Sequence, residues 1–327
     1  MGEFDLIARY FTRSVRPDGA AVLGVGDDCA LLAPAPGMQL AISSDMLVEG
    51  RHFFADVDPE ALGHKALAVN LSDLAACGAR PLAFTLALSL PRVDEPWLAG
   101  FARGMWRLAD AHGCELVGGD TTQGPLNICI TVFGEVPPGR ALLRSGARPG
   151  DDLYVSGTLG DARLALEALL GRITLPAEVL AHARQRLERP TPRVALGLQL
   201  RGIASSAMDL SDGLVGDVSH ILKASGAGAV INAEIAISLI AASAYSCSAS
   251  GTLDAELARR CTLSGGDDYE LAFTAPPGQR AAVAAAAAAS GTAVTRIGTV
   301  VAEPGLALVD GSGQPLANRY ASFDHFQ

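Results

Sequence analysis

Lysine is scarce in this chain and cysteine pairs are missing from its sequence, and both features argue against particular classes of protein. Only two lysines occur in 327 residues, Lys65 and Lys223, and neither completes a Gly-x-x-x-x-Gly-Lys-Ser/Thr sequence, so the phosphate loop of P-loop enzymes is excluded. The formal net charge of −10 argues against a surface for nucleic acid or for an anionic membrane, which would need clustered Lys and Arg. The six cysteines form no Cys-x-x-Cys pair and no zinc-like group with the six histidines, which favours reduced thiols in a cytoplasmic protein.

We also expect no targeting or membrane segment in this sequence. The first residues, Met1-Gly2-Glu3-Phe4-Asp5, are acidic and contain no basic region followed by an apolar core, so we expect no signal peptide. The alanine-rich run 281–289 is too short to span a bilayer, and we interpret it as a helix.

Glycine and aliphatic side chains are abundant. The 36 glycines and a hydrophobic content of 49% against 5% aromatic residues are typical of a soluble α/β protein with tight turns. The length favours two domains. Pro and Gly cluster without periodicity at 137–150, so we predict an amino-terminal domain over 1–138 and a carboxy-terminal domain over 149–327.

Interleaved strand and helix patterns indicate an α/β or α+β fold. We expect helices at 6–11, 60–77, 95–112, 161–170 and 179–200. Strands are expected at 22–25, 40–43, 83–90, 128–136 and 152–156. A further strand should end at 118–120, and two more should lie near 229 and 271.

Seven acidic sites lie beside glycine, serine or an apolar run. Any one of them could be a helix cap or a turn residue, because Asp accepts backbone hydrogen bonds there. Asp73 is different, since it lies within an expected helix on the same face as Asn70. We place Asp27-Asp28 and Asp45 at strand ends, where ligands commonly bind. The sites are Asp27-Asp28, Asp45, Asp73, Asp120, Asp209, Asp212 and Asp267-Asp268.

Oxygen ligands of this kind favour magnesium over zinc. Magnesium has a clear use if two phosphorylated anions must meet, because two unit charges about 4 Å apart repel by roughly 4 kcal/mol at an effective dielectric of 20. The sequence alone therefore favours a magnesium-dependent enzyme that handles phosphate.

The order of these motifs resembles the thiamine-monophosphate kinase family over nearly the whole chain. The family belongs to a wider group with the aminoimidazole ribonucleotide synthetase-like fold, which includes selenophosphate synthetase and a hydrogenase-maturation protein. The narrower resemblance depends on Val48-Glu49-Gly50-Arg51-His52-Phe53 and on the terminal Phe323-Asp324-His325-Phe326. The shared motifs are Gly24-Val25-Gly26-Asp27-Asp28, Ser43-Ser44-Asp45, Asn70-Leu71-Ser72-Asp73, Gly118-Gly119-Asp120-Thr121, Leu143-Arg144-Ser145-Gly146, Asp209-Leu210-Ser211-Asp212-Gly213 and Gly265-Gly266-Asp267-Asp268-Tyr269-Glu270.

The resemblance implies a two-domain α/β fold whose amino-terminal sheet pairs across a homodimer, with ATP and magnesium between the domains. It also implies roles for individual residues. Ser44 stands where many relatives carry threonine, and Asp267 where many carry glutamate. The implied metal ligands are Asp28, Ser43, Ser44, Asp45, Asp73, Asp120, Asp209 and Asp212. The implied ATP contacts are Gly119, Asp120, Arg144 and Ser211, and the implied thiamine-phosphate contacts are His52, Asp267 and Phe323.

The expected reaction is direct in-line attack of a phosphate oxygen of thiamine monophosphate on the γ-phosphorus of ATP. The nucleophile is already ionised near neutral pH, so no acid or base residue is expected, and charge neutralisation falls to the metal held by Asp45, Asp120 and Asp212. Three alternatives stay open. The chain could be another ATP-dependent enzyme of the group, such as aminoimidazole ribonucleotide synthetase, a maturation or carrier protein, or a protein that binds nucleotide without turnover.

Overall fold

The computed structural model describes residues 2–241 and 254–320, and it divides the chain into two compact units. Unit 1 comprises Met1–Leu74 and Ala79–Ala141, and unit 2 comprises Ala75–Gly78 and Leu142–Gln327. The domain limits 1–138 and 149–327 stay a prediction. No helix in the described part of the chain is long and apolar enough to cross a membrane.

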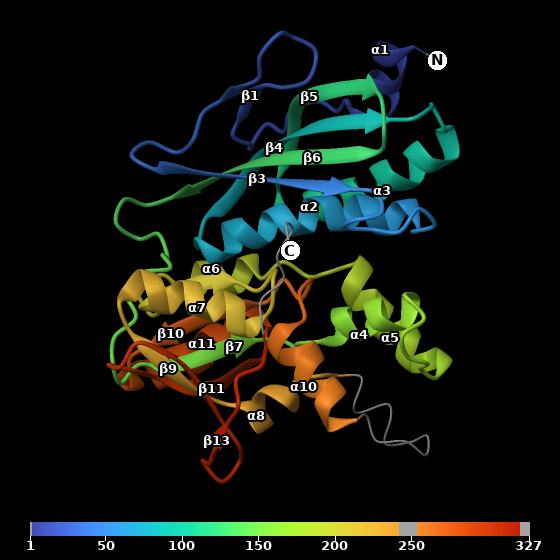
Figure 1. The fold of residues 1–327 in the computed structure, drawn as a ribbon. Helices are drawn as coiled ribbons and strands as arrows, with labels where there is room; N and C mark the ends of the chain where they lie inside the picture. The colour runs from blue at the N-terminus through green and yellow to red at the C-terminus, as the bar shows by residue number, and fades with distance from the viewer. Residues whose placement is uncertain (1, 242–253, 321–327) are drawn as a thin grey trace. The chain divides into compact units, whose positions relative to one another are not determined.

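Unit 1 is built on a four-stranded sheet in the order β3-β6-β4-β5, seen in the upper part of Figure 1. Strands β4 and β5 are parallel and are joined by α3, a standard crossover, whereas the other neighbours are antiparallel. The strands are β3 (Gln39–Val48), β4 (Arg80–Leu90), β5 (Glu115–Gln123) and β6 (Asn127–Val136).

Helices α2 (Pro59–Ala76) and α3 (Glu95–His112) cover one face of this sheet (Figure 1). They pack backbone to backbone, because a Cβ added at Gly63 would lie 2.0 Å from the carbonyl oxygen of Phe101. The Asp94 side chain caps α3 by accepting from the Trp97 N–H at 3.1 Å, and Gly113 ends the helix in the left-handed region.

The amino-terminal segment of unit 1 is irregular. The helix expected at 6–11 begins earlier, as α1 (Glu3–Leu6), and continues as the π-helical turn η1 (Ile7–Phe11). The short strands β1 (Ala21–Leu23) and β2 (Leu31–Leu32) then form an antiparallel pair. Asp27 and Asp28 lie between these two strands.

Unit 2 is built on a seven-stranded sheet in the order β13-β12-β9-β11-β7-β10-β8. Its neighbours are antiparallel except β12 and β9. The strands are β7 (Asp152–Ser156), β8 (Ser206–Asp209), β9 (Gly228–Asn232), β10 (Leu271–Ala275), β11 (Val294–Val301), β12 (Gly305–Val309) and β13 (Pro315–Leu316).

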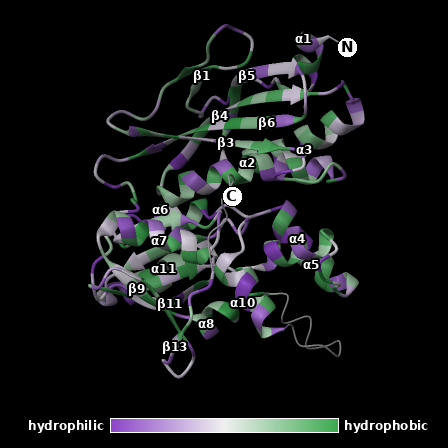
Figure 2. Ribbon diagram, viewed as in Figure 1, coloured by the Kyte–Doolittle hydropathy of each residue, from purple (hydrophilic) through white to green (hydrophobic). Residues whose placement is uncertain are grey.

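Helices cover both faces of the larger sheet. Leu153 and Val155 pack with α7, α8 and α10 in one hydrophobic core, whereas Tyr154 points to the other face and stacks on Phe273 at 5.1 Å between ring centroids. Helices α4 and α5 pair with each other and mix hydrophobic and hydrophilic residues along their length (Figure 2). The helices are α4 (Asp161–Leu169), α5 (Ala177–Glu188), α6 (Val194–Leu200), α7 (Leu214–Ser225), α8 (Ala233–Ile237), α10 (Ala255–Ser264) and α11 (Arg280–Ser290), with the 3₁₀ turn η2 (Pro277–Gln279).

The expected extents of one helix and two strands are wrong. The single helix expected over 179–200 is broken into α5 and α6, because Pro190 and Pro192 lie between them and proline has no N–H to continue a helix. Asp45 is not at a strand end. Strand β3 continues through it to Val48, and Asp45 pairs with Ile130 of β6.

Asp120 likewise lies inside a strand instead of ending one. Strand β5 runs on to Gln123, and Asp120 pairs with Ala87 of β4. The mixed α/β fold class is confirmed, whereas pairing of the amino-terminal sheet across a dimer stays a prediction.

Candidate functional site

Unit 1 contains a cavity of about 620 Å³ beside residues 116–121 of β5. Its acidic lining comes from Glu3, Asp27, Asp28 and Asp120, all exposed. Its apolar lining includes Phe4, Ile7 and Phe11 of the amino-terminal segment and Leu116 and Val117 of β5. Carboxylates beside an apolar wall suit a ligand that has both a charged part, bridged by cations, and a flat apolar part.

Gly119 gives this cavity its backbone lining. Its φ is 145°, and a Cβ at this position would lie 1.8 Å from the carbonyl oxygen of Leu86 on β4. Any larger residue would separate β5 from β4. The glycine therefore keeps Asp120 in register next to a bare stretch of backbone.

Strand β3 and helix α2 bring a second group of predicted ligands together. The Ser43 hydroxyl donates to Asp73 Oδ2, and the Asp45 N–H donates to Asn70 Oδ1 at 3.0 Å. Asn70 and Asp73 share one face of α2, and Asn70 is held by its own bond to the Ala66 carbonyl at 3.0 Å. Ser43, Asp45 and Asp73 thus lie on the helix-covered side of the sheet.

Ser44 points to the opposite side of the same strand, as the two-residue period of a strand requires. Its hydroxyl lies 2.9 Å from Thr131 Oγ1 and donates to the Ile130 carbonyl at 3.2 Å. The Ser44 hydroxyl is therefore separated by the sheet from the carboxylates of Asp45 and Asp73.

His52 lies in the turn after β3 and is half-buried. Its Nδ1 accepts from the Val48 N–H at 3.0 Å, and its own N–H donates to the Val48 carbonyl at 3.0 Å. Because Nδ1 accepts, the proton of the neutral ring lies on Nε2. The turn therefore fixes both the orientation and the tautomer of this ring.

The predicted metal ligands of unit 2 lie at the end of strand β8 and in the turn that follows it. Asp209 is the last residue of β8 and is buried, and Ser211 and Asp212 form the turn into α7. The Asp212 N–H donates to Asp217 Oδ2 at 3.0 Å. Burial raises the pKa of Asp217 to about 7, so the carboxyl group that accepts this hydrogen bond ionises near neutral pH.

The segment 266–270 lies against this turn. The Asp267 N–H donates to the Ser211 carbonyl at 2.9 Å, and the Tyr269 N–H to the Leu210 carbonyl at 2.8 Å. Asp268 is 3% exposed and accepts from the Gly160 N–H at 2.9 Å. Burial raises the pKa of Asp268 well above its usual value.

Arg144 lies on an exposed loop that is anchored at both sides. Leu143 accepts from the Ala207 N–H at 2.8 Å, and the Ser225 hydroxyl accepts from the Gly146 and Ala147 N–H groups at 3.2 and 3.1 Å. The guanidinium of Arg144 is thus presented from a fixed backbone.

The structure leaves some assignments untested. Phe323 lies outside the described residues. Within 2–241 and 254–320, no group of three or more His, Cys, Asp or Glu residues is placed to hold a metal ion. The donors that are in contact, a serine hydroxyl and carboxylates, suit a hard cation such as magnesium, and the eight metal-ligand assignments stay predictions.

Sequence reasoning did not assign the apolar lining from Phe4, Ile7 and Phe11 to any site. The only available signal was the spacing of apolar residues in the first helix, which is as typical of a core-facing helix as of a binding wall. Glu270 and its arginine partners were also missed, because the arginines lie far away in the sequence.

Comparisons with known proteins agree over the whole chain. Models of the AIR synthase related protein family match residues 26–136 (amino-terminal domain) and 148–311 (carboxy-terminal domain). The chain is 48% identical to thiamine-monophosphate kinase of Salmonella typhimurium and 47% identical to that of Escherichia coli K12, each over 99% of this chain and 98% of the relative.

Solved structures give the same result. Thiamine-monophosphate kinase from Stenotrophomonas maltophilia K279a superposes with a TM-score of 0.85 at 43% identity, covering 97% of this chain and 98% of that one. AaThiL complexed with AMPPCP and TMP has a TM-score of 0.76 at 31% identity, covering 90% of this chain and 89% of that one. The chain therefore belongs to the thiamine-monophosphate kinase family of AIR synthase related proteins.

Proposed function

We propose that this chain is a thiamine-monophosphate kinase, which transfers the γ-phosphate of ATP to thiamine monophosphate and releases thiamine diphosphate and ADP. The observation that carries the proposal is similarity over the full length, at 48% identity, to a relative named for this activity. A family member binds AMPPCP, an ATP analogue, together with TMP.

The cavity of unit 1 supports a nucleotide as the ligand. Gly119 leaves the backbone accessible beside Asp120, and the apolar lining from Phe4 and Ile7 suits the flat face of a base. We assign the ATP contacts to Gly119, Asp120, Arg144 and Ser211, with Arg144 as a fork for phosphate oxygens.

The carboxylates of both units support magnesium as the metal. Bound magnesium would neutralise the charge that two phosphorylated substrates bring together. Ser43, Asp45 and Asp73 present oxygen atoms from one side of β3, and Asp209 and Asp212 present them from the turn after β8. We assign the metal ligands to Asp28, Ser43, Ser44, Asp45, Asp73, Asp120, Asp209 and Asp212.

We assign recognition of thiamine monophosphate to His52, Asp267 and Phe323. His52 offers a ring of fixed orientation, and Asp267 a carboxylate suited to a cationic substrate. An aromatic ring such as that of Phe323 would attract the thiazolium cation. The attacking phosphate oxygen is already anionic, so these residues need only orient the substrate for in-line attack.

A homodimer is the proposed assembly. On the face of β3 opposite Ser43 and Asp45, Leu40, Ile42 and Met46 are 47%, 60% and 53% exposed. Strand β3 is also an edge strand of its sheet. An exposed apolar face on an edge strand is typical of a protein interface.

The direct test is product analysis. The full-length chain is mixed with ATP, magnesium chloride and thiamine monophosphate, and thiamine diphosphate and ADP are quantified by chromatography. We expect equal amounts of both products, and none without magnesium. Thiamine, which lacks the acceptor phosphate, and the substrate of aminoimidazole ribonucleotide synthetase are the matched controls. ADP without thiamine diphosphate, or turnover of either control substrate in its place, would refute the assignment.

A further inference from the structure

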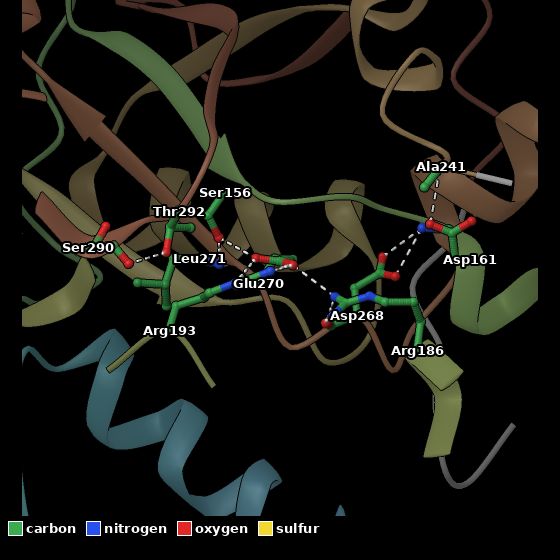
Figure 3. Close-up of polar contacts among 11 residues, drawn as sticks. Ser156, Asp161, Arg186, Arg193, Ala241, Asp268, Glu270, Leu271, Ser290 and Thr292 are labelled. Carbon is green, nitrogen blue, oxygen red and sulfur yellow. Dashed lines mark hydrogen bonds and ion pairs between the residues drawn. The ribbon is translucent and has the colours of Figure 1, made fainter. Parts of the chain in front are cut away.

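A buried ionic cluster lies under the segment that carries Asp267. Glu270 is fully buried, and its two carboxylate oxygens accept four hydrogen bonds. Arg193 donates from Nε to Oε2 at 2.6 Å and from Nη2 to Oε1 at 2.5 Å. Arg186 Nη2 donates to Oε1 at 2.8 Å, and the Ser156 hydroxyl donates to Oε2 at 2.6 Å. Figure 3 shows the two guanidinium groups converging on this carboxylate.

The cluster joins elements that are distant in sequence. Arg186 lies on α5, Arg193 directly precedes α6, Ser156 ends β7 and Glu270 directly precedes β10. Both arginine side chains are themselves mostly buried, at 14% and 17% exposed. Glu270 is therefore held from three directions, and the segment before it cannot shift independently of α5 and α6.

Backbone hydrogen bonds extend this restraint to the predicted ligand turn after β8. The Leu210 N–H donates to the Glu270 carbonyl at 2.8 Å, while Tyr269 and Asp267 donate to the carbonyls of Leu210 and Ser211. Gly266 approaches so closely that an added Cβ would lie 2.4 Å from the Ser211 carbonyl oxygen. A ladder of backbone hydrogen bonds thus joins the two segments.

This ladder is held in a costly conformation. Asp267 and Tyr269 have φ of 69° and 50°, and they are the non-glycine residues with positive φ in the described part of the chain. Such geometry persists only where the surroundings enforce it, and it is concentrated at functional sites. The buried contacts of Glu270 supply that enforcement one residue away.

We propose that Glu270, clamped by Arg186 and Arg193, is a positioning residue that sets the geometry of Asp267 and of the Asp209–Asp212 turn for magnesium-dependent phosphoryl transfer. The assignment rests on the proposed function for the identity of the ligands. The structural part, that the Glu270 cluster rigidifies the ladder, stands independently of it.

The test compares Glu270→Gln with a matched control, Asp152→Asn. Asp152 lies in the same sheet, its side chain is 2% exposed, and it also binds two arginines, with Arg280 Nε at 2.7 Å and Arg296 Nη1 at 3.0 Å. Asp152 bonds to Arg280, Arg296 and Tyr154, none of which belongs to the Asp209–Asp212 turn. Both variants thus lose a buried carboxylate that pairs with two arginines, although the arginines of Asp152 are half exposed and those of Glu270 are mostly buried.

Two measurements separate positioning from general destabilisation. Amide hydrogen exchange of the ligand-free protein reports on 205–215 and 264–272. Steady-state kinetics at a temperature where each variant is folded gives kcat and the magnesium concentration for half-maximal activity. We expect Glu270→Gln to lose exchange protection in both segments, to need about 10-fold more magnesium and to lose about 100-fold in kcat, because second-layer partners and misplacements of about 1 Å have effects of that size. Asp152→Asn should leave kcat and the magnesium requirement unchanged, and it should lower exchange protection no more in these two segments than in the rest of the unit 2 sheet.

If Glu270→Gln does not fold, Arg193→Lys takes its place in the test. This variant keeps the charge but removes the guanidinium fork, and we expect the same changes from it. Unchanged exchange in 205–215 and 264–272 in the folded variant, or an equal magnesium shift in Asp152→Asn, would overturn the proposal. If the parent protein forms no thiamine diphosphate, the proposed function fails, and the exchange measurement alone still decides the role of Glu270.

Discussion

Replacing Gly119 by alanine tests whether the approach of β5 to β4 is needed for nucleotide binding. The added Cβ would lie 1.8 Å from the Leu86 carbonyl oxygen, whereas ordinary contacts begin near 3.5 Å, so the strands would have to separate by about 1.7 Å. The φ of 145° adds a conformational cost of about 1–3 kcal/mol for any residue other than glycine. We expect a total loss of about 3 kcal/mol, near the upper end for single substitutions.

Gly118 is the matched control, because a Cβ built there has no atom within 4 Å. Thermal unfolding followed by circular dichroism should lower the Tm of Gly119→Ala by roughly 6–12 °C, whereas Gly118→Ala should stay within about 2 °C of the parent. AMPPCP titrated into each folded variant should bind Gly119→Ala at least about 10-fold more weakly, since Asp120 is displaced with its strand. Equal Tm values, or equal affinities, for the two variants would refute the reasoning.

Three further predictions follow from the same structure. Asp45→Asn and Asp120→Asn should each lower thiamine diphosphate formation by at least about 100-fold with an unchanged circular dichroism spectrum, and near-normal turnover in both would contradict the metal scheme. Arg280 and Arg296 lower the pKa of Asp152 to about 2, so the ionised carboxylate stabilises the fold above pH 4 and the benefit is lost as pH falls from about 4 to 2. Both arginines are half exposed, so solvent screening reduces the stabilisation to about 1–2 kcal/mol. Urea unfolding should show this difference in stability between the parent and Asp152→Asn at pH 7, and a difference that does not shrink at low pH would argue against this ion pair. Ile42→Lys should shift the sedimentation coefficient from dimer to monomer, whereas Val93→Lys, at an exposed valine outside the sheet, should not, and an unchanged coefficient for Ile42→Lys would exclude β3 from the interface.

Local signals in the sequence identify some elements well. Helix α3 begins and ends at the predicted residues, because Asp94 supplies a cap and Gly113 a left-handed stop at its two ends. The position of Asp73 on a helix face with Asn70 also follows from spacing alone, and both side chains do face β3.

Pairing between strands is a different matter. The polar run Ser43-Ser44-Asp45 reads locally as the end of a strand, since polar residues are depleted in strands. It continues as a strand because β6 supplies partners for its whole length. Nothing within the run indicates that partner.

The same limit applies to buried charge. Glu270 directly precedes the fully buried strand β10, and a buried carboxylate needs a cation or hydrogen-bond donors to offset the cost of its burial. The cations are Arg186 and Arg193, which lie 84 and 77 residues away. Among 25 lysines and arginines, no local pattern selects these two.

Strand β3 limits the insertions and deletions that this chain can accept in evolution. A β-bulge adds one residue to a strand, and bulges are most common at sheet edges. Here alternate residues have opposite duties, with Ser43 and Asp45 toward α2 and Ile42 and Met46 toward the outer face. A single inserted residue would exchange the two faces, so that the oxygen ligands would point away from α2 and the apolar side chains toward it. The strand should therefore tolerate many substitutions but almost no change in length.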